Sequence, residues 1–344
     1  MRILGIETSC DDTAAAVVED GRHLISSLRS SSAAIQQKFG GVVPEVAARE
    51  HVLSILPTVR DALHAAGMDW QDVDGVAVTR GPGLIGALLV GVTFAKSVGS
   101  ALNRPVVGVH HLEAHLYANA LIDPIQFPAL ALIVSGGHTT LAYWTDHGQL
   151  AVLGETLDDA AGEAFDKGAR ILGLPYPGGP AIERLADQAR PDRSITLPVA
   201  RLGADSLNFS FSGVKTRLRQ LAADAPDRAP ELAFALQEAV ADALTRNIER
   251  AYEKYPVAHL YLAGGVSANR RVREKLGDWA SRRHVTLHVP PVELCTDNGA
   301  MVAALGYYRL TKGERLGREE GPKTPWPLRE AISKAREEER ETCC

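Results

Sequence analysis

Residues 3–20 read ILGIETSCDDTAAAVVED, and this stretch decides the fold class. An apolar run, a polar turn at residues 7–13 and a second apolar run predict two strands joined by a turn. Residues 129–145, ALALIVSGGHTTLAYWT, repeat the pattern around a turn at residues 135–139. Each pair opens one half of the chain and is followed by helical segments. The sequence therefore divides into two halves of similar plan.

Strands and helices alternate through the rest of each half. The first half is expected to hold a helix at residues 45–66 with Pro57 inside it, a strand at 73–79, a glycine-rich turn at 80–83, a helix ending at 102 and a strand at 106–109. The second half is expected to hold helices at 159–172, 180–188, 212–222 and 229–254, strands at 259–262 and 285–289, and helices from 267 and 297. This alternation predicts an α/β fold with mostly parallel sheets. We expect one lobe over residues 1–110, a second over 111–327 and a charged helical tail over 328–344.

Composition limits the classes of protein to consider. The chain has 344 residues, of which 45% are hydrophobic and 23% charged, as in a globular protein of two domains. Its formal net charge of -5 means that nucleic acid would have to bind at a local basic patch or through a partner. The four cysteines show no repeated spacing, which indicates a reducing compartment. Glu7 comes too early for a signal peptide, and the apolar run at residues 81–95 is too short to span a bilayer. We therefore expect a soluble, cytoplasmic protein with no membrane association.

His111 and His115 form a candidate metal site. On a helix, side chains four positions apart project from one face, so both imidazoles could bind one ion. The other interpretation is the ordinary polarity of an exposed helix. Asp297, at a strand-to-helix junction, could supply a carboxylate, although helix capping is its simpler role. A zincin-type protease is excluded, because its motif needs Glu directly after the first His, where this chain has Leu112.

Two glycine-containing turns follow predicted strands. In the turn at residues 134–138, glycine permits positive φ and successive backbone N–H groups could bind an anion, although an ordinary hairpin turn is equally compatible. At residues 262–269 a strand runs into Gly264 and Gly265 and then into a helix N-terminus, an arrangement that binds nucleotide phosphates. Asn269 is placed to hydrogen-bond a ligand. The alternative is that Ser267 caps the helix while Asn269 faces solvent.

Charged residues cluster in three further places. Asp159 and Asp166 lie seven residues apart on one side of a predicted helix, either as a solvated face or as an acidic stripe facing a cleft. Basic residues cluster at residues 215–219 and again at 270–283. Each basic cluster suits ordinary surface solubility, and each could also contact RNA phosphates.

Taken together, these segments resemble the universal tRNA threonylcarbamoyladenosine transferase family, formerly described as O-sialoglycoprotein endopeptidases. The resemblance runs from Arg2 to about Pro327. It is carried by the motifs GIETSCD at residues 5–11, GGVVPE at 40–45, the His111/His115 pair, VSGGHT at 134–139, the acidic segment at 158–167, YPGGP at 176–180, FSFSGVK at 209–215 and GGVSAN at 264–269.

The resemblance implies an actin-like ATPase fold, of the superfamily that includes sugar kinases, with two lobes around a nucleotide cleft. It implies one divalent metal, iron with zinc as the alternative, held by His111, His115 and Asp297. It also implies a catalytic role for Asp11 as acceptor of the amine proton. The residues implied to contact the adenylate substrate are Ile133, Val134, Ser135, Gly136, Gly137, Asp166, Gly179 and Asn269. Two positions depart from the family pattern: Asp12 stands where Glu is usual, and Glu183 where Asp often meets the ribose.

The implied reaction transfers the threonylcarbamoyl group from threonylcarbamoyl-AMP to tRNA. The acceptor is the exocyclic N6 amine of the adenosine directly 3′ of the anticodon, in tRNAs that read codons beginning with adenine. The implied protein partners are a smaller paralogue of the same fold and a small ATPase subunit.

Two other functions compete with this one. A small-molecule kinase could have the same fold, but Mg²⁺ prefers oxygen ligands to the histidine pair. A non-catalytic scaffold like the smaller paralogue should lack both the metal pair and the second lobe.

Overall fold

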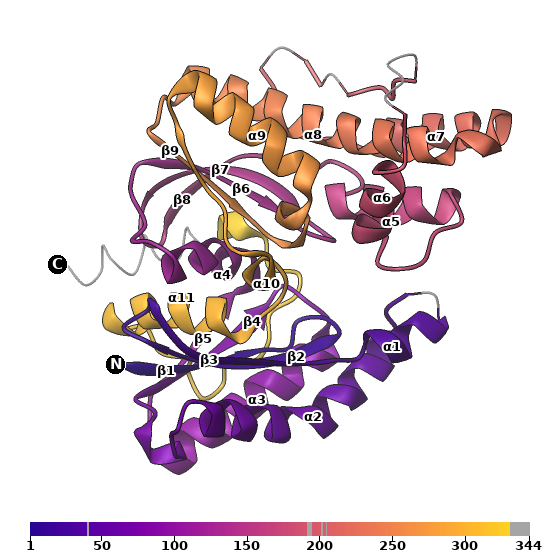
Figure 1. Cartoon of the computed structure of the whole chain (residues 1–344). Coiled ribbons are helices and arrows are strands. Elements are labelled where there is room, and N and C mark those ends of the chain that lie inside the picture. Colours follow the sequence, from indigo (N-terminus) through magenta and orange to yellow (C-terminus); the bar gives the residue numbers. More distant parts are fainter. Residues whose placement is uncertain (40, 191–194, 201, 204, 331–344) are drawn as a thin grey trace. The chain divides into compact units, whose positions relative to one another are not determined.

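A computed structural model describes residues 1–39, 41–190, 195–200, 202–203 and 205–330. The chain divides into two compact units (Figure 1), one of Met1–Ile125 with Thr296–Cys344 and one of Gln126–Cys295. The chain therefore leaves the first unit once and returns to it. This division differs from the expected boundary at residue 110, because residues 111–125 and 296–330 pack with the first sheet. Most of the expected tail at 328–344 lies outside the described residues.

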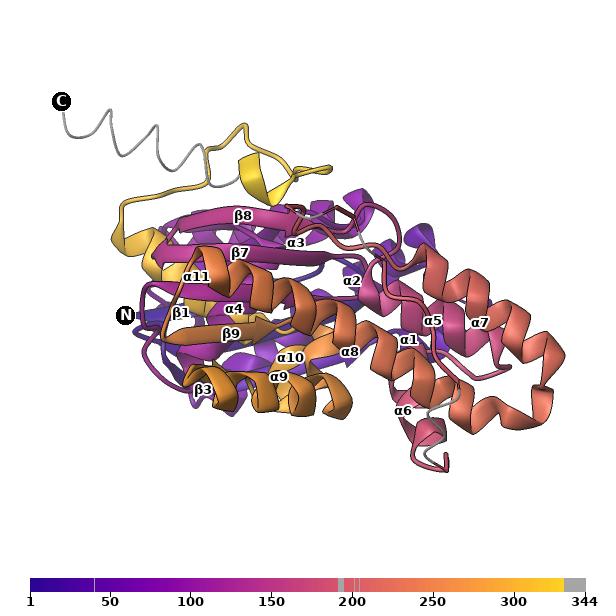
Figure 2. The same cartoon turned by 90° about the horizontal axis from the view of Figure 1, so that it is seen from above.

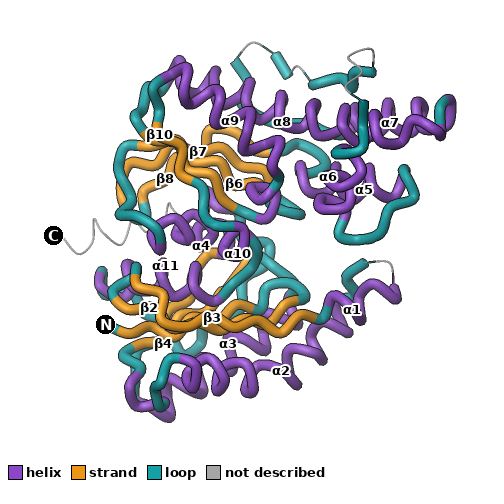
Figure 3. The backbone as a smooth tube through the Cα atoms, in the orientation of Figure 1, coloured by secondary structure: helices purple, strands orange, loops and turns teal. Residues whose placement is uncertain are grey.

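The first unit is built on a five-stranded sheet in the order β3-β2-β1-β4-β5. Its strands are β1 (Arg2–Glu7), β2 (Asp12–Glu19), β3 (His23–Ser31), β4 (Gly75–Gly81) and β5 (Val106–His110). Strands of both units are drawn in orange in Figure 3. β1, β2 and β3 pair antiparallel, while β1, β4 and β5 pair parallel. The sheet is thus mixed rather than mostly parallel. Short turns join the first three strands, whereas helical crossovers lead to the parallel ones.

Helices cover both faces of this sheet. α2 (Pro44–Ala65) and α3 (Ile85–Leu102) pack on one face, and α11 (Gly299–Thr311) packs on the other (Figure 1). Because side chains alternate along a strand, Leu4 and Ile6 of β1 join the core under α2 and α3 while Gly5 faces α11. A Cβ atom on Gly5 would lie 2.1 Å from the Gly299 carbonyl oxygen. Glycine is therefore needed for α11 to lie this close to β1.

The remaining helices of the first unit are short. They are α1 (Ala33–Gln36), α4 (His111–Tyr117) and the 3-10 turns η1 (Gln37–Phe39), η2 (Trp70–Asp72) and η3 (Ala118–Leu121). α2 continues through Pro57 as a single helix. α4 starts directly after β5 and packs against α11.

The second unit repeats the plan of the first. Its sheet has the order β10-β9-β6-β7-β8, and its strands are β6 (Ala129–Val134), β7 (Thr139–Asp146), β8 (Gln149–Glu155), β9 (His259–Ala263) and β10 (Thr286–His288). β6, β7 and β8 pair antiparallel, while β6, β9 and β10 pair parallel. The similarity between residues 3–20 and 129–145 is therefore a repeat of whole sheets, and its prediction from sequence is confirmed.

The helices of the second unit pack on this sheet and on one another. They are α5 (Ala161–Ile171), α6 (Gly178–Ala186), α7 (Ser212–Asp224), α8 (Ala229–Lys254), α9 (Arg270–Arg283), α10 (Val292–Cys295) and the 3-10 turns η4 (Pro226–Arg228) and η5 (Gly265–Ala268). α8 and α9 run side by side over the sheet (Figure 2). Their apolar faces bury Leu236, Leu244, Leu276 and Trp279.

Among the helices of the described residues, α3 is long and apolar enough to cross a membrane by length and composition, with a mean hydropathy of 1.6. Its buried side chains pack on β4 and α2, so part of this apolarity belongs to the core of the unit. Ile85 and Leu89 of the same helix remain exposed.

Candidate functional site

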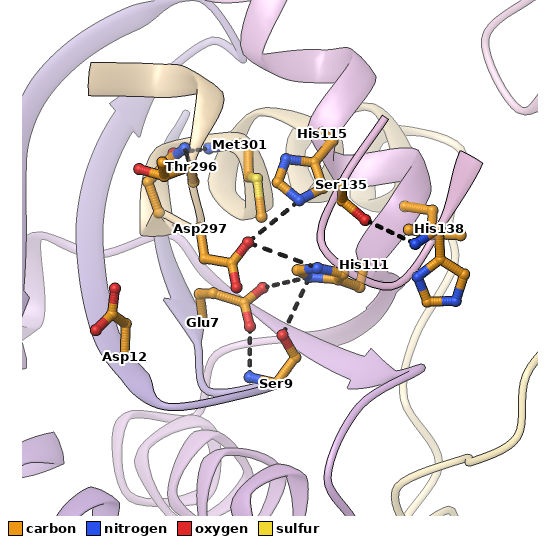
Figure 4. Close-up of polar contacts among 12 residues, drawn as sticks. Glu7, Ser9, Asp12, His111, His115, Ser135, His138, Thr296, Asp297 and Met301 are labelled. Atoms are coloured by element: carbon orange, nitrogen blue, oxygen red, sulfur yellow. Dashed lines mark hydrogen bonds and ion pairs between the residues drawn. The ribbon is translucent and has the colours of Figure 1, made fainter. Parts of the chain in front are cut away.

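His111 and His115 lie together on α4, as the spacing predicted. Their ring centroids are 4.7 Å apart, and His115 is almost fully buried (Figure 4). The Asp297 carboxylate reaches both rings, with Oδ1 at 3.2 Å from His115 Nε2 and 3.6 Å from His111 Nε2. Candidate ligand atoms of the three residues all lie within 4.8 Å of one another. All three residues belong to the first unit.

Asp297 is not the cap of the following helix. Asn298 is the N-cap of α11, because its Oδ1 accepts a hydrogen bond from the Met301 N–H at 2.8 Å. The capping role considered for Asp297 from the sequence is therefore wrong. Its carboxylate is left to face the two imidazoles.

The nitrogens of His115 fit a metal ion. Nδ1 makes no hydrogen bond and Nε2 meets the Asp297 carboxylate, although the side chain is only 1% exposed. Buried polar atoms are nearly always hydrogen-bonded, and an ion is one of the few explanations for an exception. Two imidazoles and a carboxylate are also a donor set typical of zinc or iron.

Glu7 orients His111 from the other side. This carboxylate is fully buried at the end of β1, and its Oε2 lies 3.1 Å from His111 Nδ1 (Figure 4). It also accepts hydrogen bonds from the Ser9 N–H and the Thr79 hydroxyl, each at 2.5 Å. A carboxylate that accepts the Nδ1 proton fixes the tautomer and leaves Nε2 free to bind a metal.

Glu7 was not singled out as a site residue in the sequence. The available signal was a carboxylate directly following the apolar strand at residues 3–6. A charged group in such a place is almost never fully buried unless it is paired.

The carboxylates also set the charge of His111. Burial alone would lower the pKa of this imidazole, but the neighbouring Glu7 and Asp297 carboxylates raise it to about 9. Burial would raise the pKa of Asp297, yet the two imidazoles hold it well below its usual range. Without a metal, the cluster is therefore an ion-paired group with a proton on His111 at neutral pH.

Asp11 and Cys10 follow Glu7 in the turn between β1 and β2. Burial, together with Asp11 and Asp297, raises the pKa of the Cys10 thiol far above its ordinary value. The thiol is consequently a poor nucleophile and a poor metal ligand. The carboxylates of Asp11 and Asp297 both act on the Cys10 thiol, so both lie within electrostatic range of it. Asp12 is occupied by an ion pair with Arg29 at 3.4 Å.

In the second unit, the turn at residues 133–137 leaves open space beside its glycines. A Cβ atom on Gly136 or Gly137 would meet no heavy atom within 4 Å. Neither residue has a positive φ, so the conformational reason expected for these glycines is wrong. Room beside the backbone is what distinguishes the turn.

The two glycine turns of the second unit pack on each other and on α5. Gly264 has a φ of 89°, and a Cβ atom there would lie 2.5 Å from the Val134 carbonyl oxygen. A Cβ atom on Gly162, at the start of α5, would lie 2.5 Å from the Ser135 carbonyl oxygen. The ends of β6 and β9 and the N-terminus of α5 therefore meet at one place.

Asp166 and Gly179 meet where α5 approaches the start of α6. Asp166 Oδ1 accepts a hydrogen bond from the Gly178 N–H at 2.7 Å, and partial burial raises the pKa of this carboxyl. A Cβ atom on the neighbouring Gly179 would meet nothing within 4 Å. The first turn of α6 thus offers backbone that a ligand could approach.

Asn269 does not face solvent, so that alternative is wrong, and its contact with a ligand stays a prediction. It is itself the N-cap of α9, with Oδ1 accepting from the Val272 N–H at 3.1 Å, and it is only 7% exposed. Its Nδ2 donates to Glu183 Oε2 at 3.0 Å and to Gln237 Oε1 at 2.8 Å. Both amide hydrogens are therefore used inside the protein. Glu183 lies one turn after Gly179 on α6, so Asn269 fixes a carboxylate on the face that bears Gly179.

Several residues of the two basic clusters pair with carboxylates. Arg271 and Lys275 both pair with Glu238, and Lys215 pairs with Asp159. Arg273 turns inward and donates to the carbonyl oxygens of Ser267 and Pro290. Part of the positive charge of α9 is therefore engaged inside the protein, and its contact with RNA phosphates stays a prediction.

Comparison with known proteins identifies the family. A family model described as "tRNA N6-adenosine threonylcarbamoyltransferase" matches residues 23–304. The chain belongs to this family. A threonylcarbamoyltransferase of Bacillus subtilis (strain 168) is 50% identical over 321 residues, which are 92% of this chain and 92% of that protein. A counterpart from Bacillus thuringiensis (strain Al Hakam) is 50% identical over 319 residues, 91% of this chain and 92% of that protein.

Solved structures show how widely the fold of this threonylcarbamoyltransferase family is shared. HypF of T. kodakarensis aligns with a TM-score of 0.61 at 15% identity over 90% of this chain and 48% of that one. Component A of Acidaminococcus fermentans (R)-2-hydroxyglutaryl-CoA dehydratase aligns with a TM-score of 0.54 at 16% identity over 90% and 99%. Likenesses at this identity show the fold alone. They confirm the expected actin-like ATPase fold.

The contact between Glu7 and His111 gives a first prediction. In the metal-free protein, Glu7→Gln should lower the pKa of His111 from about 9 toward its ordinary 6.5, because the variant loses the nearest negative charge. Wild-type His111 should stabilise the fold fully below pH 6.5 and lose this contribution as the pH rises through about 9. NMR titration of the imidazole and unfolding temperatures at each pH would measure both effects.

Ser9→Ala is the matched control for this prediction. It removes the hydroxyl that lies 3.2 Å from the same Nδ1 atom but keeps the Glu7 charge. The pKa of His111 should therefore change less than in Glu7→Gln. Equal pKa values in the two variants would show that Glu7 does not set the charge of His111.

Proposed function

We propose that this chain transfers the threonylcarbamoyl group from threonylcarbamoyl-AMP to N6 of the adenosine directly 3′ of the anticodon in tRNA. The observation that carries the proposal is 50% identity over 92% of the chain to a protein named for this activity. The kinase alternative has no comparable support. A hexokinase of Thermus thermophilus aligns at 17% identity with a TM-score of 0.50, which indicates a related fold and nothing about substrate.

We further propose that His111, His115 and Asp297 hold one divalent metal ion, iron in preference to zinc. The buried, unpartnered Nδ1 of His115 and the Asp297 carboxylate facing both rings support this assignment. When bound, such an ion would supply Lewis acidity that polarises and orients the acyl-phosphate group. Glu7 would hold His111 in the ligand tautomer, and the buried surroundings would keep the ligand set from rearranging.

For the adenylate, we propose contacts with the turn Ile133–Gly137 and with Asp166, Gly179 and Asn269. Open backbone at Gly136, Gly137 and Gly179 supports the first part of this set. Because the Asn269 amide is bonded to Glu183, we propose that Asn269 also aims the Glu183 carboxylate at the ribose hydroxyls. The longer Glu side chain is held in place by a second hydrogen bond, from the Arg270 N–H at 3.1 Å.

The reaction then balances as an acyl transfer. The N6 amine attacks the carbamoyl carbon, and the bond between that carbon and the phosphate oxygen breaks. AMP leaves with the electron pair of this bond, and the Asp11 carboxylate accepts the proton lost by the amine. Asp11 suits this role because it lies in the turn that follows Glu7, and because its carboxylate and that of Asp297 both act on the Cys10 thiol.

An exposed apolar surface supports the proposed partnership with a smaller paralogue. On α2, Val52, Leu53 and Leu56 are 63%, 70% and 53% exposed, and on α3, Ile85 and Leu89 are 57% and 53% exposed. The two helices pack together, with Gly86 against Ala48, so these side chains form one patch. Patches of this kind usually mark protein interfaces. We propose the paralogue as its occupant, with a small ATPase subunit and tRNA as further cytoplasmic partners.

The metal assignment predicts a loss of both metal and transfer. His111→Ala combined with His115→Ala should abolish metal retention and transfer to tRNA, because two of three ligands are gone. Elemental analysis of the purified protein and mass spectrometry of tRNA nucleosides would measure these quantities. His64→Ala, at an exposed position of α2, is the control and should change neither. Full metal content in the double variant would refute the ligand assignment. Normal transfer to tRNA by a metal-free protein would show that the reaction does not need the metal.

The open glycine turn predicts a selective loss of nucleotide binding. Gly137→Val should leave the unfolding temperature unchanged, because its side chain would meet no protein atom within 4 Å at Cβ. It should weaken binding of AMP and of a non-hydrolysable substrate analogue at least tenfold, because the valine would occupy the ligand's place. Gly277→Val on α9, where a Cβ atom also meets nothing, is the control. If calorimetry gave Gly137→Val and the wild type equal affinities for AMP, the nucleotide would have to bind elsewhere.

The apolar patch predicts a specific loss of partner binding. Leu53→Glu with Leu56→Glu should prevent a complex with the smaller paralogue, because two carboxylates would be buried without partners. Arg60→Ala, farther along α2, should leave the complex intact. Light scattering of the mixed proteins would measure its formation. If the double variant still formed the complex, this surface would not be the interface with the paralogue.

A further inference from the structure

Glu113 is a buried carboxylate that the proposed chemistry does not use. It lies on α4 between His111 and His115 in sequence, two positions from each, so it points away from the face that carries the imidazoles. Its side chain is 0% exposed. It forms an ion pair with Arg309 of α11, whose Nη2 donates to Glu113 Oε2.

Stability alone is a weak reason for this ion pair. A buried pair has to overcome the loss of hydration of both charges, and an apolar pair of similar volume is often as stable. Glu113 Oε1 has no hydrogen-bond partner, so the hydration lost by this carboxylate is only partly replaced. The arrangement is better explained by what it holds in place.

Arg309 and Glu113 join the two segments that carry the candidate ligands. His111 and His115 are on α4, and Asp297 lies two residues before the start of α11. The same two helices meet again where the rings of Tyr117 and Tyr308 lie 5.2 Å apart. α4 is thus held on one face by the ion pair and faces Asp297 with the other. Its rotation and its distance from α11 are both constrained.

We infer that the buried Glu113–Arg309 ion pair positions the metal centre, by fixing α4 against α11 so that His111, His115 and Asp297 keep the spacing that one ion requires. This inference rests on the proposed metal site. Glu113 and Arg309 are positioning residues that contact neither metal nor substrate. Metal affinity depends on ligand positions to within a few tenths of an ångström, so loosening the helix pair lowers affinity without removing a ligand.

Glu314 provides a matched control within the same network. Arg309 Nη1 also donates to Glu314 Oε2 at 2.8 Å, and Glu314 follows α11 in a partly exposed segment. Glu314→Gln therefore removes one carboxylate from Arg309 without releasing α4. Glu113→Gln removes the other carboxylate at nearly constant shape and leaves Glu314 to pair with Arg309.

The test measures metal affinity separately from stability. Dissociation constants for Zn²⁺ and Fe²⁺ would be determined on the full chain by competition with a chelator, and unfolding temperatures on the metal-free protein. Glu113→Gln should weaken metal binding about tenfold to a hundredfold, as losses of supporting groups around metal sites usually do. Glu314→Gln should stay within about twofold of the wild type.

A double variant distinguishes positioning from general support of the fold. Glu113→Leu with Arg309→Met replaces the pair by apolar side chains, which should restore the unfolding temperature but not the metal affinity. Equal affinities in Glu113→Gln and Glu314→Gln would overturn the inference, as would a double variant that regains full metal affinity. A wild-type protein that binds no metal would overturn the metal centre itself, and the inference with it.

Discussion

The first unit is organised around one buried carboxylate. Glu7 ends the central strand β1, accepts hydrogen bonds from the following turn and from β4, and contacts His111 at the start of α4. A fully buried charge is tolerated only when it is paired and hydrogen-bonded. The positions of the turn, of β4 and of α4 are therefore tied to this one group. The same contact gives His111 its charge and its orientation toward Asp297.

The second unit uses backbone rather than charge to form its candidate binding surface. Gly264 and Gly162 allow the ends of β6 and β9 and the start of α5 to meet without side chains between them. Open space remains beside Gly136, Gly137 and Gly179. The repeated sheet thus provides two kinds of site at equivalent strand ends, a charged cluster in one unit and an open glycine surface in the other. The two repeated sheets thus carry different kinds of site, as expected of a fold that serves many chemistries.

Several roles that the sequence left open depend on neighbours that a polar residue meets only in the folded chain. Helix capping was the simpler role for Asp297 by itself and a metal ligand the one that the family resemblance implied; the neighbouring Asn298 takes the capping role. Asn269 could have faced solvent, but its amide holds Glu183 and Gln237. The basic residues of α9 could contact RNA, and in the folded chain most of them also pair with carboxylates of α8 or with Asp187, which follows α6. Charge patterns along a sequence omit the partners that folding supplies.

The sequence by itself determined the α/β class, the repeat of the sheet motif, the histidine pair and the family. These features depend on local periodicity and on motifs of adjacent residues, and both can be recognised in the sequence alone. Only the tertiary structure decided that residues 296–330 return to the first unit, that Glu7 supports His111 and that Glu113 meets Arg309. Each of these joins groups that are on the order of a hundred residues or more apart. Their pairing depends on which faces of which elements are buried together, and no local pattern encodes that.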